Sequence, residues 1–150
     1  MAEEQIPQPL FVMQPSSTAA VPPEQLYSII GESGIARLTA AFYRQIPGDD
    51  ILAPMYPEDD LQASEERLRD FLIFRFGGSQ RYIEQRGHPR LRMRHAPFPI
   101  DQRARDRWIT CMEKALNQMS FPDHAITALR TFFQEVATFL INRDATPQGV

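Results

Sequence analysis

The sequence predicts an all-α fold, and three observations support this. Beyond Pro23, apolar residues recur at intervals of three and four, the spacing of one face of an α-helix. No convincing run alternates apolar and polar residues, so we predict no β-strand. Glycines and prolines divide the periodic stretches into helix-sized segments, most clearly at Pro47-Gly48 and Gly77-Gly78.

The length predicts one small domain with two short tails. A chain of 150 residues buries roughly 68–70% of its unfolded surface, which is enough for a core with room for a ligand. Five prolines fall within the first 23 residues, so 1–22 is expected to be a mostly disordered extension, 23–143 the domain and 144–150 a frayed tail. The apolar cluster 10–13 could dock on the domain or on a second copy, or belong to a solvated tail.

The composition argues against several classes of function. A net charge of −3 gives no overall field that attracts nucleic acid or an anionic membrane. The single cysteine, Cys111, excludes an internal disulfide and is compatible with a cytoplasmic location. No apolar run approaches the roughly 20 residues of a membrane-spanning helix, and the acidic N-terminus differs from the basic start of a secretory signal.

Two helices are predicted before the first proline-glycine boundary. The first covers about 24–30 and stops at Gly31. The second starts near Ser33, whose side chain can cap it, and ends before Pro47. Its apolar stripe contains Ile35, Leu38, Phe42 and Ile46.

Two tyrosines lie at the end of this region. Tyr43 is at the edge of the apolar stripe, so its ring can be buried while its hydroxyl needs a hydrogen-bond partner. A short turn at 51–55 then leads to Tyr56.

The next helix opens at 59–60, where two aspartates suit a helix N-terminus, and ends at Gly77-Gly78. Ser64 is a small polar residue on its apolar stripe. It could relieve packing against a neighbouring helix, or leave an entrance to a ligand pocket that Leu68 also borders. A loop containing Tyr82 follows.

The most informative segment is 86–98, where four arginines surround a histidine. In a short helix after Pro89, Leu91 precedes His95 by four residues and Phe98 follows it by three, so the three share one face. An imidazole between apolar side chains, with cations at the rim, suits haem, which has an iron and anionic propionates. The alternative is a hydrogen-bonded core or rim histidine beside a solvated basic face.

Two longer helices complete the chain. The helix 101–119 is capped by Asp101 and carries Trp108, whose indole could fill the core or donate a hydrogen bond to a ligand. The helix 123–142 has an apolar stripe without candidate chemistry and is interpreted as core.

The segment 86–98 resembles the proximal-histidine region of the group II truncated haemoglobins, a family of bacterial-like globins. Other segments match this family in the same order, and the resemblance covers about residues 25–142. These segments are Phe42-Tyr43, Met55 to Leu61, Glu65 to Leu68, Phe76 to Gly78 with Tyr82, and Arg105 to Trp108.

The resemblance implies a two-over-two helical sandwich around haem b. His95 would be the metal ligand, held at its other ring nitrogen by a carbonyl or water. The other cofactor contacts would be Arg94, Arg67 and Tyr82 at the propionates and Leu68 and Ser64 over the open side of the iron. The hydrogen-bond donors that carry the chemistry would be Tyr43, Tyr56 and Trp108.

The function implied is binding of dioxygen, carbon monoxide, nitric oxide or peroxide at ferrous haem. Each donor contributes about 1.5–3 kcal/mol to holding a charged acceptor, or roughly 10- to 100-fold in dissociation rate. Slow release favours oxygen scavenging, or nitric oxide or peroxide detoxification, over oxygen transport. The enzyme would then be a haem-dependent peroxidase or nitric oxide dioxygenase served by an unidentified reductase, as a monomer or homodimer.

Two alternatives remain from the sequence. The haem protein could be a gas sensor that signals through the extension 1–22. A cofactor-free helical module could instead use the basic cluster Arg86–Arg94 to contact nucleic acid or an acidic protein. Arginine attracts phosphate, but only Phe98 and Tyr82 are near for base stacking, so we expect no nucleic-acid partner.

Overall fold

The structure, a computed structural model, describes residues 20–144. Every regular element in this stretch is helical, which confirms the all-α prediction. Short 3₁₀ turns lie at 23–25, 46–48, 53–55 and 58–60. The α-helices are α1 Leu26–Tyr43, α2 Leu61–Arg75, α3 Arg81–Arg86, α4 Leu91–His95, α5 Gln102–Asn117 and α6 Asp123–Phe139.

The sequence-predicted tails fall almost entirely outside this range. Residues 1–19 with the apolar cluster 10–13, and residues 145–150, lie beyond the described part of the chain. The described chain contacts the core from its start, since Val21 packs against it. Between residues 20 and 144, no helix is both long and apolar enough to cross a membrane.

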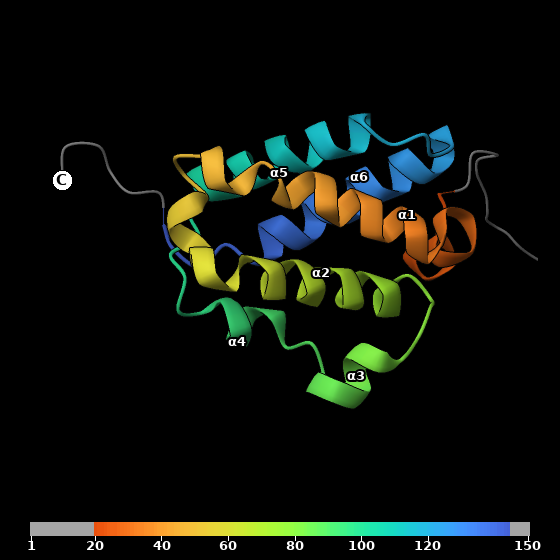
Figure 1. Ribbon diagram of the computed structural model, residues 1–150, viewed down its shortest axis with the longest axis horizontal. Helices are drawn as coiled ribbons and strands as arrows, with labels where there is room; N and C mark the ends of the chain where they lie inside the picture. The colour runs from red at the N-terminus through yellow and green to blue at the C-terminus, as the bar shows by residue number, and fades with distance from the viewer. Residues whose placement is uncertain (1–19, 145–150) are drawn as a thin grey trace, which may run out of the picture.

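Two antiparallel helix pairs form the body of the protein (Figure 1). α1 lies beside α2, α5 lies beside α6, and α1 also packs on α5. Side chains buried between the pairs each contribute about 1.5–3 kcal/mol to stability. The largest include Leu38, Phe42, Leu72, Met112 and Leu129. The predicted two-over-two sandwich is therefore confirmed.

The first helix is kinked at Gly31, whose backbone (φ 74°, ψ 169°) is far from helical and is favourable only for glycine. The predicted boundary is correct, but the segments on its two sides form one element. α1 begins at Leu26, after a 3₁₀ turn that includes Glu24. The Ser33 cap is wrong, because its hydroxyl accepts a hydrogen bond of 2.7 Å from the Arg37 side chain.

The double glycine after α2 lets two chain segments cross closely. The Tyr27 N–H donates to the Phe76 carbonyl at 2.8 Å. A Cβ at Gly77, where φ is +100°, would collide with the carbonyl oxygen of Glu24, and one at Gly78 would come within 2.6 Å of the Tyr27 ring. Only glycine at both positions permits this contact between the end of α2 and the start of α1.

The segment predicted as a loop around Tyr82 is the helix α3. Tyr82 is 4% exposed, and its ring lies 5.6 Å from that of Phe71 and 6.4 Å from that of Phe74. The loop prediction failed because a helix of six residues is too short to show apolar periodicity.

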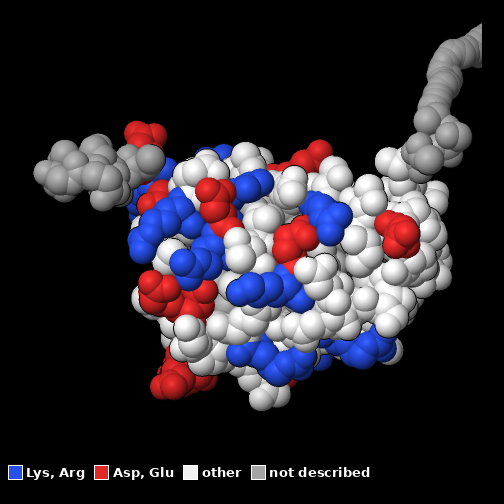
Figure 2. Space-filling view, turned by 90° about the horizontal axis from the view of Figure 1, so that it is seen from above, with Lys and Arg blue, Asp and Glu red and all other residues white. Residues whose placement is uncertain are grey.

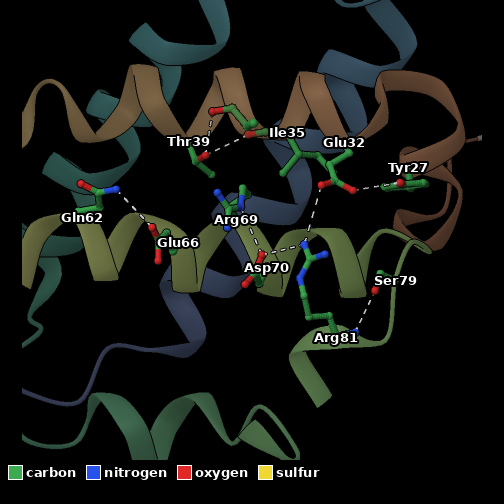
Figure 3. A network of polar contacts seen from close by, with 11 residues as sticks. Tyr27, Glu32, Ile35, Thr39, Gln62, Glu66, Arg69, Asp70, Ser79 and Arg81 are labelled. Carbon is green, nitrogen blue, oxygen red and sulfur yellow. Dashed lines mark hydrogen bonds and ion pairs between the residues drawn. The ribbon is translucent and has the colours of Figure 1, made fainter. Parts of the chain in front are cut away.

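Arg81 fixes α3 against the rest of the fold (Figure 3). Its guanidinium lies 3.0 Å from the Asp70 carboxylate on α2 and 3.9 Å from the Glu32 carboxylate on α1. Its backbone N–H donates to the Ser79 hydroxyl at 3.1 Å. Ion pairing raises the pKa of Arg81, so this cation is present at every accessible pH.

Asn142 closes the loop that follows α4. The last helix ends at Phe139, three residues before the predicted end, and this frees the Asn142 side chain. Its amide nitrogen donates to the carbonyls of His95 (3.1 Å) and Phe98 (3.0 Å), and its oxygen accepts from the Ile100 N–H at 2.9 Å. One side chain therefore holds both ends of the 95–100 loop.

Replacing Asn142 with alanine removes these three hydrogen bonds. At about 0.5–1.5 kcal/mol each, we expect Asn142→Ala to lower the free energy of unfolding by about 1.5–4.5 kcal/mol in denaturant titrations. Asn117→Ala, at the exposed end of α5, is the matched control and should change it by less than about 0.5 kcal/mol. Equal losses in the two variants would contradict the role of Asn142.

Candidate functional site

A cavity of about 330 Å³ lies between the helices, at the lower end of the range for ligand pockets. Every helix, and the segment between α1 and α2, contributes to its walls. All nine candidate residues from the sequence line this one cavity: Tyr43, Tyr56, Ser64, Arg67, Leu68, Tyr82, Arg94, His95 and Trp108.

His95 ends α4 and is half-buried at the cavity wall. Its Nδ1 lies 2.7 Å from the Leu91 carbonyl oxygen, one helical turn earlier. A carbonyl can only accept, so Nδ1 carries the proton, and in the neutral ring Nε2 keeps a free lone pair. The histidine is thus prepared to coordinate a metal through Nε2.

The backbone before α4 is held in an unusual conformation. Arg90 has φ 43° and ψ 53°, the left-handed region that non-glycine residues rarely adopt. Arg94 folds back over this turn and donates to the carbonyls of Pro89 (2.6 Å) and Arg86 (2.8 Å). Arg94, predicted only as a cofactor contact, therefore also braces the approach to α4.

Three polar aromatic side chains meet at another part of the cavity. Tyr43 comes from the end of α1, Tyr56 from the segment before α2, and Trp108 from α5. The two tyrosine rings stand edge to face, with centroids 5.6 Å apart. Trp108 packs on Phe42 (4.9 Å) and Phe133 (5.7 Å), which fixes its indole. Trp108 is therefore both part of the packing and part of the cavity wall.

Both hydroxyls stay protonated well above neutral pH. Burial, together with the neighbouring Tyr56, raises the pKa of Tyr43 far above its ordinary value. Burial also raises the pKa of Tyr56 to about 12, although hydrogen bonding from Trp108 and Tyr43 works in the opposite direction. An indole N–H can only donate, so Trp108 can serve only as a donor toward Tyr56.

At the rim, Arg67 joins Asp60 and Ser64 in a polar cluster. The Arg67 Nη2 lies 2.7 Å from the Asp60 carboxylate and 2.8 Å from the Ser64 hydroxyl. The hydrogen bond from Arg67 lowers the pKa of Asp60. The predicted capping role of Asp60 is wrong, because α2 begins after it without a side-chain cap and its carboxylate pairs with Arg67.

The cavity also has walls that the sequence analysis missed. Arg86 and Arg105 line it but were not assigned to the site. The spacing of Arg105 from Trp108, three residues on one helix, was an available signal. α6, interpreted as core alone, supplies an apolar wall formed by Phe132, Phe133, Val136, Ala137 and Leu140. A wall of apolar side chains has the same helical pattern whether it meets protein or ligand.

A second, more open cleft of about 700 Å³ lies between the end of α1 and α5. Its wall includes Cys111, which is 3% exposed, with its thiol 3.8 Å from the Asp49 carboxylate. Burial, aided by Asp49, raises the pKa of the Cys111 thiol. The cleft therefore holds a protonated and poorly accessible thiol.

The residues around the main cavity suit a metal that brings most of its own ligands. Within residues 20–144, no group of three or more His, Cys, Asp or Glu side chains could hold a metal ion. A metal at His95 would need its other ligands from a cofactor, as a porphyrin provides. The apolar walls and the arginines at the rim fit a planar ring with anionic edge groups.

Known proteins share both the sequence and the fold. The family model for bacterial-like globins matches residues 25–142. Group 2 truncated hemoglobin YjbI of Bacillus subtilis is 37% identical over 93 residues, which cover 62% of this chain and 70% of that protein.

Two solved structures extend the comparison. The thermostable haemoglobin of the actinobacterium Thermobifida fusca is 43% identical, with a TM-score of 0.76, over 79% of this chain and 97% of that one. The truncated oxygen-avid haemoglobin of Bacillus subtilis is 31% identical, with a TM-score of 0.75, over 79% and 99%. The chain belongs to the bacterial-like globin family and, within it, to the group II truncated haemoglobins.

Proposed function

We propose that this protein binds haem b in the main cavity, with His95 as the axial ligand, and holds dioxygen and other diatomic ligands with slow release. The main supporting observation is that one cavity is lined by an imidazole with a free Nε2 and by the donor groups of the buried Tyr43 and the half-buried Tyr56 and Trp108. In Figure 1, α4, which ends at His95, lies below α2, whereas α1 and α5, which carry Tyr43 and Trp108, lie above it.

Haem, when bound, supplies an iron that takes small diatomic ligands and exchanges electrons. His95 contributes a neutral imidazole, and the hydrogen bond to Leu91 keeps its ring in one orientation. Arg67 and Arg94 would contact the propionates, as would Tyr82. Ion pairs at this rim are worth only about 0–1 kcal/mol each, so they orient the cofactor more than they retain it.

Tyr56 is the proposed direct donor to the diatomic ligand. The Trp108 indole can only donate and the Tyr43 hydroxyl stays protonated, so we expect both to donate to Tyr56 and to leave its proton for the cavity. Tyr43 would then act mainly through Tyr56, by fixing the direction of that hydroxyl. Ser64 is turned toward Arg67 and Asp60, which makes it a pocket border more than a donor.

Slow release of the diatomic ligand favours a chemical reaction at the site over the transport of oxygen. The Bacillus subtilis relative is described as oxygen-avid, and the same kind of behaviour is proposed for this chain. Dioxygen held this long can react with nitric oxide before it dissociates. The same site could also reduce peroxide. We therefore place oxygen scavenging and nitric oxide or peroxide detoxification ahead of oxygen transport, with an external reductase restoring the ferrous state.

Removing the imidazole tests the axial ligand. We expect His95→Ala to lose the proximal-histidine spectrum in the reduced and carbon-monoxide-bound states, because no other side chain replaces Nε2. His88→Ala, an exposed histidine on the turn before α4, is the control and should keep that spectrum. A normal spectrum in His95→Ala would show that the iron is held elsewhere.

Removing single hydroxyls tests the donor assignment. Loss of the direct donor in Tyr56→Phe should speed oxygen dissociation about 10- to 100-fold, measured by stopped flow. Tyr43→Phe should have the smaller effect, about tenfold or less, because it acts through Tyr56. Tyr27→Phe, which lies outside the cavity, should leave the rate unchanged. A larger effect in Tyr43→Phe than in Tyr56→Phe would reverse the assignment.

The buried hydroxyls also predict an alkaline loss of stability. The folded state keeps the Tyr56 proton until pH about 12, whereas an unfolded tyrosine loses it near 10.0. Between these values the native state binds more protons, so the free energy of unfolding falls as pH rises. Denaturant unfolding across this window should show the fall in wild type and a shallower one in Tyr56→Phe. Parallel curves for the two proteins would contradict it.

A further inference from the structure

The outer side of α4 and its neighbours carries an unusual set of apolar side chains. Met93 is 59% exposed, Phe139 54% and Phe98 38%, and these are the large apolar side chains exposed within residues 20–144. Arg92 joins this group to the end of α6, since its guanidinium lies 5.3 Å over the Phe139 ring and donates to the Phe139 carbonyl at 3.0 Å. Asn142 holds the Phe98 backbone beside this end of the chain.

The same surface carries a local excess of positive charge. Residues 85–100 contain four arginines and no carboxylate. Arg86, Arg90 and Arg92 are exposed and form no ion pair with any residue of the described chain. Figure 2 looks onto the other side of the molecule, where acidic and basic side chains lie next to one another. The ion-paired arginines are Arg67, Arg69, Arg75, Arg81, Arg105, Arg107 and Arg130.

We propose that this surface docks an acidic protein that delivers single electrons to the cavity. We term it the arginine face, and its residues are Arg86, Arg90, Arg92, Met93, Phe98 and Phe139. The inference rests on the proposed function, because an electron donor is needed only if the cavity holds a redox-active iron.

The chemistry of the surface favours a protein partner. Protein interfaces have an apolar centre inside a polar rim and are enriched in methionine, aromatic residues and arginine. Nucleic acid would need a series of exposed aromatic rings along a cationic groove, whereas here one face of the Phe139 ring is occupied by the Arg92 guanidinium. An acidic rim on the partner would complement the unpaired guanidinium groups of Arg86, Arg90 and Arg92.

The position of the surface suits electron delivery. The inner side of α4 places Leu91 and His95 in the cavity wall, while Arg92 and Met93 of the same short helix are exposed on its outer side. A helix with its side chains is about 10–12 Å across, so a docked protein would approach the cavity to about this distance. In this step the donor's cofactor would lose one electron, and iron held in the cavity would gain it and pass from ferric to ferrous. No atom or proton is transferred.

The test uses the full chain and a plant-type [2Fe–2S] ferredoxin, an acidic one-electron donor, as the probe. The variant is Arg90→Asn with Arg92→Gln, because asparagine tolerates the left-handed backbone at 90 and glutamine retains a donor at 92. The control is Arg37→Gln with Lys114→Gln, an equal change in net charge on the exposed sides of α1 and α5. Binding is followed by NMR shift perturbation, and reduction by stopped-flow absorbance.

We expect wild type to bind at low salt and to lose affinity toward about 0.15 M salt. The double variant should bind about tenfold more weakly and be reduced about tenfold more slowly than wild type. The control should stay within about twofold of wild type in both measurements. Binding is readable with or without haem, so a failure to take up haem leaves the docking result intact.

Three outcomes would overturn the proposal. The first is equal affinity in the two variants, or no binding at low salt. The second is weaker binding without slower reduction, which would leave a docking surface that delivers no electron. The third is self-association, or binding of duplex DNA, that the double variant abolishes, which would assign the surface to a second copy or to nucleic acid.

Discussion

The hydrogen bond from the His95 imidazole to the Leu91 carbonyl is the constraint on which the rest of the site depends. It lies inside a helix of five residues, which has almost no stability of its own. The fold therefore supports α4 from both sides. Arg94 ties α4 to the preceding turn, and Asn142 ties the following loop to the segment after α6. One ring nitrogen is aimed by contacts from residues far apart in the sequence.

The donors are controlled by a different means, which is burial. A phenol removed from water holds its proton strongly and must find a partner among its neighbours. Tyr43 and Tyr56 satisfy each other in part, and Trp108 adds a donor that cannot accept. Donation by Trp108 can therefore run only outward from its indole, and the Tyr56 hydroxyl is the proposed donor to the ligand.

The fold and the positions of the candidate residues could be predicted largely from the sequence, because each carries a local signal. His95 has an apolar face and arginine neighbours, and Trp108 lies at helical spacing after a capping aspartate. The failures arise where tertiary contacts decide the outcome. Asp60 looked like a cap, but Arg67, two helical turns further along, takes up its carboxylate. The helix around Tyr82 depends on ion pairs to two other helices, which local pattern does not contain.

The setting of Cys111 matters for a protein proposed to handle oxidants. Sulfenic acid formation requires an accessible thiolate, and this sulfur is enclosed by the helices, where burial and then the neighbouring Asp49 carboxylate raise its pKa. Peroxide reaching the molecule therefore finds no reactive sulfhydryl. Two molecules also cannot form a disulfide through Cys111 unless the fold opens. Turnover under oxidising conditions therefore creates no covalent link between chains through this residue.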